Sequence, residues 1–169
     1  RYRPARITHV EKPSNLKKKS IKIPGGSYNM GYSENNFCYD VELPEHKVYI
    51  NDFQIENFPV TNAQYLEFIE DGGYDDFSFW LSDGWDVVKK NEWKAPMYWE
   101  KEDGEWFTRD FIGKRKINTN EPVCHVSFYE AMAFCKWADK RLPTEAEWEK
   151  AALWNEPENE KTIFPWGND

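Results

Sequence analysis

A chain of 169 residues with 22 basic and 30 acidic side chains has a net charge of −8 and a pI near 5.0, which argues against nucleic acid or an anionic membrane as a partner. The length suits one domain with its own core. No segment approaches the roughly 20 apolar residues of a membrane span, and the first residues lack the apolar region of a signal peptide. We therefore expect a cytoplasmic protein.

Aromatic residues are unusually frequent, with 9 Trp, 9 Tyr and 11 Phe, although the mean hydropathy is only −0.88. This combination predicts irregular backbone that packs on aromatic side chains. The three cysteines, Cys38, Cys124 and Cys135, cannot all pair, and they contain no C-x-x-C motif. Buried reduced thiols are the simplest interpretation, and one disulfide with one free thiol is the alternative.

The first third of the chain predicts a linker followed by two hairpins. Residues 1–20 contain two prolines and no apolar period, which is typical of a linker. Residues 21–31 alternate apolar and polar side chains around Pro24-Gly25-Gly26, and this pattern predicts a short hairpin. Residues 47–55 predict a second hairpin, with Asn51-Asp52 as its two-residue loop.

The middle third predicts one helix and one strong hairpin. Thr61 and Gln64 form a capping box, and the apolar period after it ends at Gly72-Gly73, where glycine suits the left-handed end of a helix. Residues 74–96 are irregular, with one or two helical turns between 85 and 92. Asp103-Gly104 lies between two aromatic runs and predicts a hairpin, and the basic run 114–116 is expected to be a loop.

Two further capping boxes, Ser127 with Glu130 and Thr144 with Glu147, predict two helix starts. The first helix has apolar residues at three- and four-residue spacing, which predict its buried stripe: Phe128, Ala131, Met132, Cys135 and Ala138. Residues 140–143 separate the helices, because the residue before Pro143 is pushed out of the helical region. Short strands interleaved with helices predict the α+β class.

The histidines do not form a metal-binding motif. His9, His46 and His125 have none of the spacings H-x-x-x-H or H-E-x-x-H. His125, between Cys124 and Val126, is interpreted as a hydrogen-bonded core histidine rather than a ligand. A site made of Cys38, Cys124 and His125 is the alternative, although no spacing requires it.

The tryptophan-rich segment offers the candidate binding residues. Six aromatic residues gather within 80–106, and they form either a ligand pocket or the core of a loop-rich region: Trp80, Trp85, Trp93, Tyr98, Trp99 and Trp106. The core is favoured for the set and for Trp99, which adjoins the predicted hairpin. Trp85 and Trp80 are the candidate substrate-binding residues. No catalytic residue and no metal ligand is predicted.

Five motifs occur in the order in which they occur in the formylglycine-generating-enzyme-like (sulfatase-modifying factor) domain: Gly25-Gly26-x-Tyr28-x-Met30-Gly31, Phe58-Pro59-Val60-Thr61-Asn62, Pro122-Val123-x-His125-Val126-Ser127, RLPTEAEWE at 141–149, and Phe164-Pro165-Trp166-Gly167. Residues 21–169 resemble the N-terminal part of that domain. Residues 71–85 and 95–106 are similar to its ergothioneine-type sulfoxide synthase branch (EgtB).

The resemblance implies a C-type-lectin-like α+β fold, incomplete at the C-terminus. It also implies an oxidoreductase that uses non-haem iron(II) and O2 to join the sulfur of γ-glutamylcysteine or cysteine to trimethylhistidine (hercynine) as a sulfoxide, in ergothioneine biosynthesis. In that branch a helical DinB-like domain holds the iron, so its ligands are expected outside this chain. Calcium is a further implied cofactor, and its ligands in the family lie beyond the matched motifs.

The same resemblance leaves two other functions open. One is a copper-dependent formylglycine-generating oxidase that modifies sulfatases, and the other is a non-catalytic binding module on a lectin-like scaffold. In each enzyme reading, the chain is expected to be a fragment that is inactive by itself. Its expected partners are small-molecule substrates and the missing iron-binding domain.

Overall fold

The computed structural model describes residues 17–33, 37–111, 113–155 and 160–168. The predicted linker, 1–20, lies almost wholly outside these ranges, and the first strand begins at its last residue, Ser20. The chain divides into two compact units. We call Lys18–Phe58 with Pro143–Asp169 the ribbon unit, and Pro59–Leu142 the helical unit.

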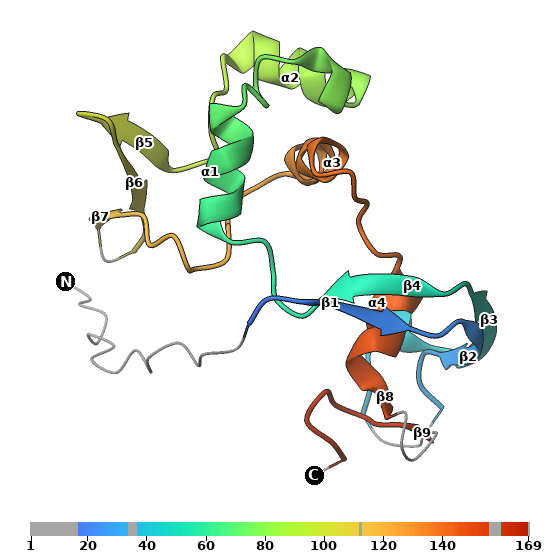
Figure 1. Ribbon diagram of the computed structural model, residues 1–169. Helices are drawn as coiled ribbons and strands as arrows, with labels where there is room; N and C mark the ends of the chain where they lie inside the picture. Colours follow the sequence, from blue (N-terminus) through green and yellow to red (C-terminus); the bar gives the residue numbers. More distant parts are fainter. Residues whose placement is uncertain (1–16, 34–36, 112, 156–159, 169) are drawn as a thin grey trace. The chain divides into compact units, whose positions relative to one another are not determined.

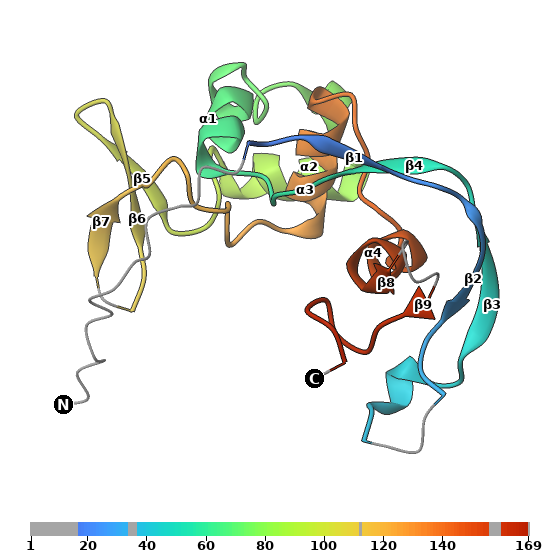
Figure 2. The same cartoon turned by 60° about the horizontal axis from the view of Figure 1, so that its bottom comes forward.

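The ribbon unit is built on four strands, β1 (Ser20–Ile23), β2 (Gly26–Met30), β3 (His46–Ile50) and β4 (Phe53–Glu56). Both predicted hairpins are wrong, because β1 pairs with β4 and β2 pairs with β3, each antiparallel. The two pairs keep one register from end to end, with Ser20 opposite Glu56 and Met30 opposite His46. They therefore form one long two-stranded ribbon, whose curvature Figure 2 shows clearly.

The two turn signals read from the sequence lie opposite each other and bend this ribbon. The backbone N–H of Gly25 donates to Oδ1 of Asp52 over 2.7 Å. A Cβ on Gly25 would lie 2.5 Å from the carbonyl oxygen of Ile50, a distance that real Cβ atoms essentially never show. Glycine is needed here because two backbones meet, so a local turn signal became a bend in a longer ribbon.

We expect Gly25→Ala to destabilise the ribbon unit by roughly 1–3 kcal/mol, the usual range for forcing extra atoms into a filled space. The neighbour in the clash is backbone, which cannot rotate away. Urea unfolding followed by circular dichroism measures the effect. Ser27→Ala is the matched control, since Ser27 is exposed on β2 and should change stability by less than about 0.5 kcal/mol. Equal stability of both variants would contradict the prediction.

Helix α4 (Glu145–Leu153) packs against the ribbon, as Figure 1 shows within this unit. Its predicted capping box is confirmed, with Glu147 N–H donating to Thr144 Oγ1 and Thr144 N–H to the Glu147 carboxylate. The core beneath it is Tyr28, Ile50 and Phe53. Two short strands, β8 (Trp154–Asn155) and β9 (Glu160–Lys161), pair with each other, and residues 164–167 form the predicted turn.

The helical unit contains α1 (Asn62–Glu70), α2 (Ser82–Asn91) and α3 (Phe128–Trp137). The capping boxes of α1 and α3 are confirmed, and Gly72 follows α1 with a left-handed φ of 81°. Figures 1 and 2 show α1 between α3 and the three-stranded sheet formed by residues 99–116. A 3₁₀ turn, Phe77–Phe79, precedes α2. The predicted pair of helices around residue 140 is thus α3 and α4, which belong to different units.

The buried face of α3 differs from the predicted stripe. Cys135 of the predicted stripe is buried, as expected, but Ala133 and Phe134 outside the stripe are buried as well, whereas Phe128 within it is 60% exposed. The aromatic rings of α1 decide the difference. Tyr65 stacks on Phe134 with ring centroids 5.4 Å apart, and this contact selects which side of α3 faces inward. Periodicity locates an apolar face only approximately when a helix is apolar on several sides.

A three-stranded antiparallel sheet completes the helical unit, with β5 (Trp99–Glu102), β6 (Glu105–Arg109) and β7 (Lys114–Lys116) in that order. The Asp103-Gly104 hairpin is confirmed, and both residues have positive φ, as a type I′ turn requires. The expectation of a loop at 114–116 is wrong. These basic residues pair along β6 and meet the acidic residues Glu100, Glu102 and Glu105.

Three buried tyrosines, Tyr28, Tyr65 and Tyr74, should make the protein sensitive to alkali. Burial is the main cause that raises the pKa of each phenol well above its ordinary value. The folded state therefore keeps these protons while the unfolded chain begins to release them above about pH 10. We expect the melting temperature to fall as the pH rises beyond that point. A melting temperature that stays level to pH 11.5 would contradict this.

Candidate functional site

A cleft of about 730 Å³ opens in the helical unit between the start of β5, the end of β6 and the start of α3. Its wall is mainly apolar and aromatic, and its polar groups are few. The lining residues are Trp93, Ala95, Met97, Tyr98, Arg109, Asp110, Phe111, His125, Val126, Ser127 and Glu130. The size and lining are those of small-molecule sites.

Two residues in the wall have left-handed backbone. Tyr98 has φ 70° and His125 has φ 61°, a conformation that costs a non-glycine residue roughly 1–2 kcal/mol. Their rings meet edge to face with centroids 5.0 Å apart, and the N–H of Met97 donates to the His125 carbonyl over 3.3 Å. Such conformations concentrate at functional sites. The interpretation of His125 as a core residue is wrong, because its side chain is exposed beside Tyr98.

One lining residue of the cleft, Glu130, is a buried acidic residue that is only 3% exposed. One oxygen accepts from Ser127 N–H over 2.7 Å, as a capping box requires, and the other accepts from the Tyr74 hydroxyl over 2.5 Å. Burial, with the nearby Tyr65 and Glu130, raises the pKa of Tyr74, so its phenol remains a donor. Glu130 thus ties the wall of the cleft to the aromatic core.

Two charged residues stand at the end of β6. Asp110 accepts from Arg115 Nε over 3.0 Å and from Gly113 N–H over 3.1 Å, and Arg115 also pairs with Glu121. Within the described ranges, the Arg109 side chain makes one polar contact, between Nη2 and Glu100 Oε1 at 3.5 Å. The same Glu100 carboxylate lies 3.2 Å from Lys114 Nζ. Arg109 is therefore the lining group with the most unused hydrogen-bond capacity.

Neither of the two candidate substrate-binding residues, Trp80 and Trp85, lines the cleft. Both pack in the aromatic core of the helical unit. Trp80 is 7% exposed in the core, and its Nε1 donates to the Gly73 carbonyl over 2.7 Å. Trp85 is half-buried, with its ring centroid 6.4 Å from that of Trp80 and Lys89 over its face. Of the six aromatic residues, Trp93 and Tyr98 line the cleft. Substrate contact by Trp80 or Trp85 stays a prediction.

Trp85→Ala should lower stability by roughly 1–3 kcal/mol, less than the usual 3–5 for a fully buried tryptophan, because the ring is half-buried. Trp80→Ala, at a buried position, is the matched comparison and should cost more. Urea unfolding measures both. Steady-state kinetics of the longer protein then decide the substrate contact. A raised KM for Trp85→Ala with unchanged stability would place this ring in a pocket.

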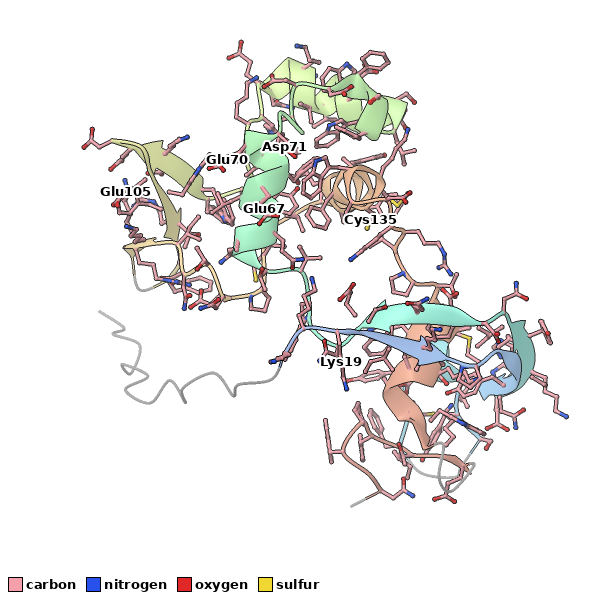
Figure 3. All side chains as sticks on the ribbon, viewed as in Figure 1. Lys19, Glu67, Glu70, Asp71, Glu105 and Cys135 are labelled. Atoms are coloured by element: carbon pink, nitrogen blue, oxygen red, sulfur yellow. The ribbon has the colours of Figure 1, made fainter. Side chains whose placement is uncertain are left out.

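The thiols and acidic groups do not assemble a metal site in the described ranges, where no three His, Cys, Asp or Glu side chains lie together. The conceivable trio is divided, since Cys38 is in the ribbon unit and Cys124 with His125 is in the helical unit. All three thiols are free, and only Cys135 is buried. Figure 3 shows Cys135 on α3. Burial raises the pKa of the Cys135 thiol.

Sequence reasoning missed Arg109 and Phe111 as site residues. Arg109 ends β6 and Phe111 follows it, and no motif distinguishes them in the sequence. The left-handed backbone at Tyr98 also has no sequence signal, whereas histidine, as at position 125, is one of the residue types enriched in this conformation.

None of the helices in the described ranges combines the length and the apolar character that a membrane span requires.

Residues 7–169 match the family described as "Sulfatase-modifying factor enzyme 1-like domain". The chain belongs to this family. Its α+β architecture is that of the formylglycine-generating-enzyme fold, as the resemblance implied. The match begins at residue 7, earlier than the expected domain start at 21, so the boundary between linker and domain stays a prediction.

Two enzyme names recur among the similar proteins. A "Hercynine oxygenase" of Mycolicibacterium smegmatis is 42% identical over 152 residues, covering 88% of this chain and 35% of the relative. That of Mycobacterium tuberculosis is 41% identical, covering 77% and 30%. The "Formylglycine-generating enzyme" of Mus musculus is 33% identical, covering 89% and 43%. The chain spans about a third of the length of these hercynine oxygenases, and its relationship to both groups confirms the motif-based resemblance.

Proposed function

We propose that this chain is part of an iron(II)- and O2-dependent sulfoxide synthase that acts in ergothioneine biosynthesis. The observation that carries the proposal is the 42% and 41% identity to two proteins named hercynine oxygenase, against 33% to a formylglycine-generating enzyme. The substrates are trimethylhistidine and a thiol, γ-glutamylcysteine or cysteine. The setting is the cytoplasm, where such thiols remain reduced.

The proposed reaction balances with one O2. The thiol loses its S–H hydrogen and the imidazole loses one C–H hydrogen, a C–S bond forms, and the sulfur takes one oxygen atom. The second oxygen atom leaves as water, so the four electrons accepted by O2 come from the two substrates. Bound iron supplies the activation of O2. The described residues hold no cluster that fits an iron site, and we assign no step of the reaction to them.

The role of this chain in that protein is to supply a scaffold and one wall of a binding region. The cleft wall is supported from behind by the Glu130–Tyr74 hydrogen bond and by the aromatic core. Its aromatic lining and single underused guanidinium suit a polar small molecule with an apolar part.

The test uses the longer protein that contains these residues. With Fe(II), O2, trimethylhistidine and γ-glutamylcysteine, mass spectrometry should find one sulfoxide product, and the anaerobic sample should give none. The 169-residue chain alone should give no product in the same assay. Turnover by that chain alone would contradict the proposal that it is a fragment.

The second candidate function is a copper-dependent formylglycine-generating oxidase, which the 33% identity to the mouse enzyme supports. The longer protein would then convert the cysteine of a sulfatase-derived peptide to an aldehyde when loaded with copper. Formation of the aldehyde without sulfoxide would favour this candidate. Neither product from a folded, metal-loaded protein would favour a binding module.

A further inference from the structure

Arg109 is the polar group of the cleft whose bonding is least complete. Asp110 accepts from Arg115, and the Glu130 carboxylate accepts from Tyr74 and Ser127. The Arg109 guanidinium has five N–H donors, and the described residues offer it one long contact of 3.5 Å to Glu100. That carboxylate is shared with Lys114 at 3.2 Å. A carboxylate in the cleft would match this planar fork of donors better than Glu100 does.

The apolar wall next to Arg109 is unusually exposed. Phe111 is 102% exposed, Met97 59% and Tyr98 50%, although all three line one cleft. Large exposed apolar side chains gathered around a cavity mark a binding surface. Aromatic faces favour a planar group that can lie against them. The combination therefore specifies two parts of a ligand, a planar apolar body and an anionic end.

A cationic ligand fits the same groups less well. Arg109 would repel it, and the Glu130 carboxylate is 3% exposed with both oxygens already accepting hydrogen bonds. Asp110 is ion-paired with Arg115, which also pairs with Glu121. Among the described residues of the lining, Arg109, with one contact of 3.5 Å to Glu100, is therefore the charged group with the weakest pairing.

We propose that this cleft binds a small carboxylate whose planar apolar body lies against Tyr98 and Phe111 while its carboxylate pairs with Arg109. No comparison assigns this site. The inference goes beyond the proposed reaction, because it concerns binding alone and requires neither iron nor O2. A failure of binding and a failure of turnover are therefore separate results.

Three probes with the same ring test the charge requirement: indole-3-acetate, indole-3-acetamide and tryptamine, which are anionic, neutral and cationic. Each is titrated into the longer protein and into the 169-residue chain, in the absence of metal, and followed by ligand-observed NMR. Indole-3-acetate should bind about tenfold more tightly than the amide, the order of magnitude of a charge-assisted pair. Tryptamine should bind most weakly.

Variants locate the site. Arg109→Gln should weaken indole-3-acetate about tenfold and leave the amide unchanged, and Arg109→Lys should recover part of the loss. Phe111→Ala should weaken the anionic and neutral probes alike. Lys116→Gln is the matched control, since it removes a positive charge from the same sheet outside the cleft, and it should change nothing. The three side chains that these variants change are exposed, and a thermal melt verifies that each variant is folded.

The proposal is overturned by equal binding of the three probes, by a preference for tryptamine, or by no binding to the folded longer protein. It is also overturned if Arg109→Gln and Lys116→Gln weaken the binding of indole-3-acetate equally. That result would mean that the affinity depends on the total charge of the sheet and not on Arg109. Loss of the indole-3-acetate preference in Arg109→Gln alone, with turnover still present or absent, supports it.

Discussion

Phe68→Ala should lower the free energy of unfolding by about 3–5 kcal/mol, the largest effect of any single substitution in the helical unit. Phe68 is 0% exposed and lies within 6.3 Å, centroid to centroid, of five aromatic rings: Tyr65, Tyr74, Phe79, Phe134 and Trp137. These rings belong to α1, the following loop, the 3₁₀ turn and α3. Removal of the central ring therefore leaves a cavity with walls that cannot all close.

Urea unfolding monitored by tryptophan fluorescence measures this loss. Phe111→Ala is the matched control, because Phe111 is fully exposed and its removal should change stability by less than about 0.5 kcal/mol. Natural domains are stable by about 5–15 kcal/mol, so the loss at Phe68 is a large share of the whole. Equal unfolding midpoints of the two variants would show that the aromatic cluster does not support the helical unit.

Glu149→Gln should destabilise the ribbon unit by roughly 2–3 kcal/mol, below the 3–5 typical of a fully buried pair. The Glu149 carboxylate accepts from the Tyr28 hydroxyl over 3.0 Å, from Gly31 N–H over 3.1 Å and from Lys161 Nζ over 2.6 Å. It joins α4, the end of β2 and β9. The amide would keep the shape but leave the Lys161 charge, 21% exposed, without its anion.

Two comparisons separate the buried ion pair from a general effect of charge. Lys116→Gln breaks the exposed pair between Lys116 and Glu105, whose side chains are 63% and 52% exposed, and should cost less than about 1 kcal/mol. The double variant Glu149→Gln, Lys161→Met should be more stable than Glu149→Gln alone, since it removes the unpaired charge. A double variant that is less stable would mean that the other bonds of Lys161, to the Asn29 and Gly31 carbonyls, dominate.

The starts of α1, α3 and α4 were predictable because each depends on two residues that are three positions apart. At Thr61, Ser127 and Thr144 the cap and the residue three positions later satisfy each other's backbone groups, and the structure confirms all three boxes. The Asp103-Gly104 turn was predictable for the same reason, since its two residues carry the required positive φ themselves. The family was also legible, because its motifs occur in order within the chain.

The pairing of β1 with β4 and of β2 with β3 was not predictable, because it depends on residues far apart. The turn signals at Pro24-Gly25 and Asn51-Asp52 are locally sound, yet they face each other across a ribbon that joins β1 to β4 and β2 to β3. The basic run 114–116 forms a strand, because acidic residues of β5 and β6 lie across the sheet and pair with its lysines. Local composition carries no information about such partners.

Sequence information was therefore sufficient for the α+β class, the family, the starts of α1, α3 and α4 and the aromatic character of the core. Each of these depends on neighbours in the chain or on total composition. The start of α2 at Ser82, which has no side-chain cap, was missed. The tertiary structure alone decided which residues form the cleft. His125 was expected in the core but is exposed in the wall of the cleft. The two candidate binding residues, Trp80 and Trp85, do not line the cleft. Arg109 and Phe111 line it from the end of β6 and the turn that follows. The cleft is formed where three distant segments converge, and only their packing brings those side chains to one surface.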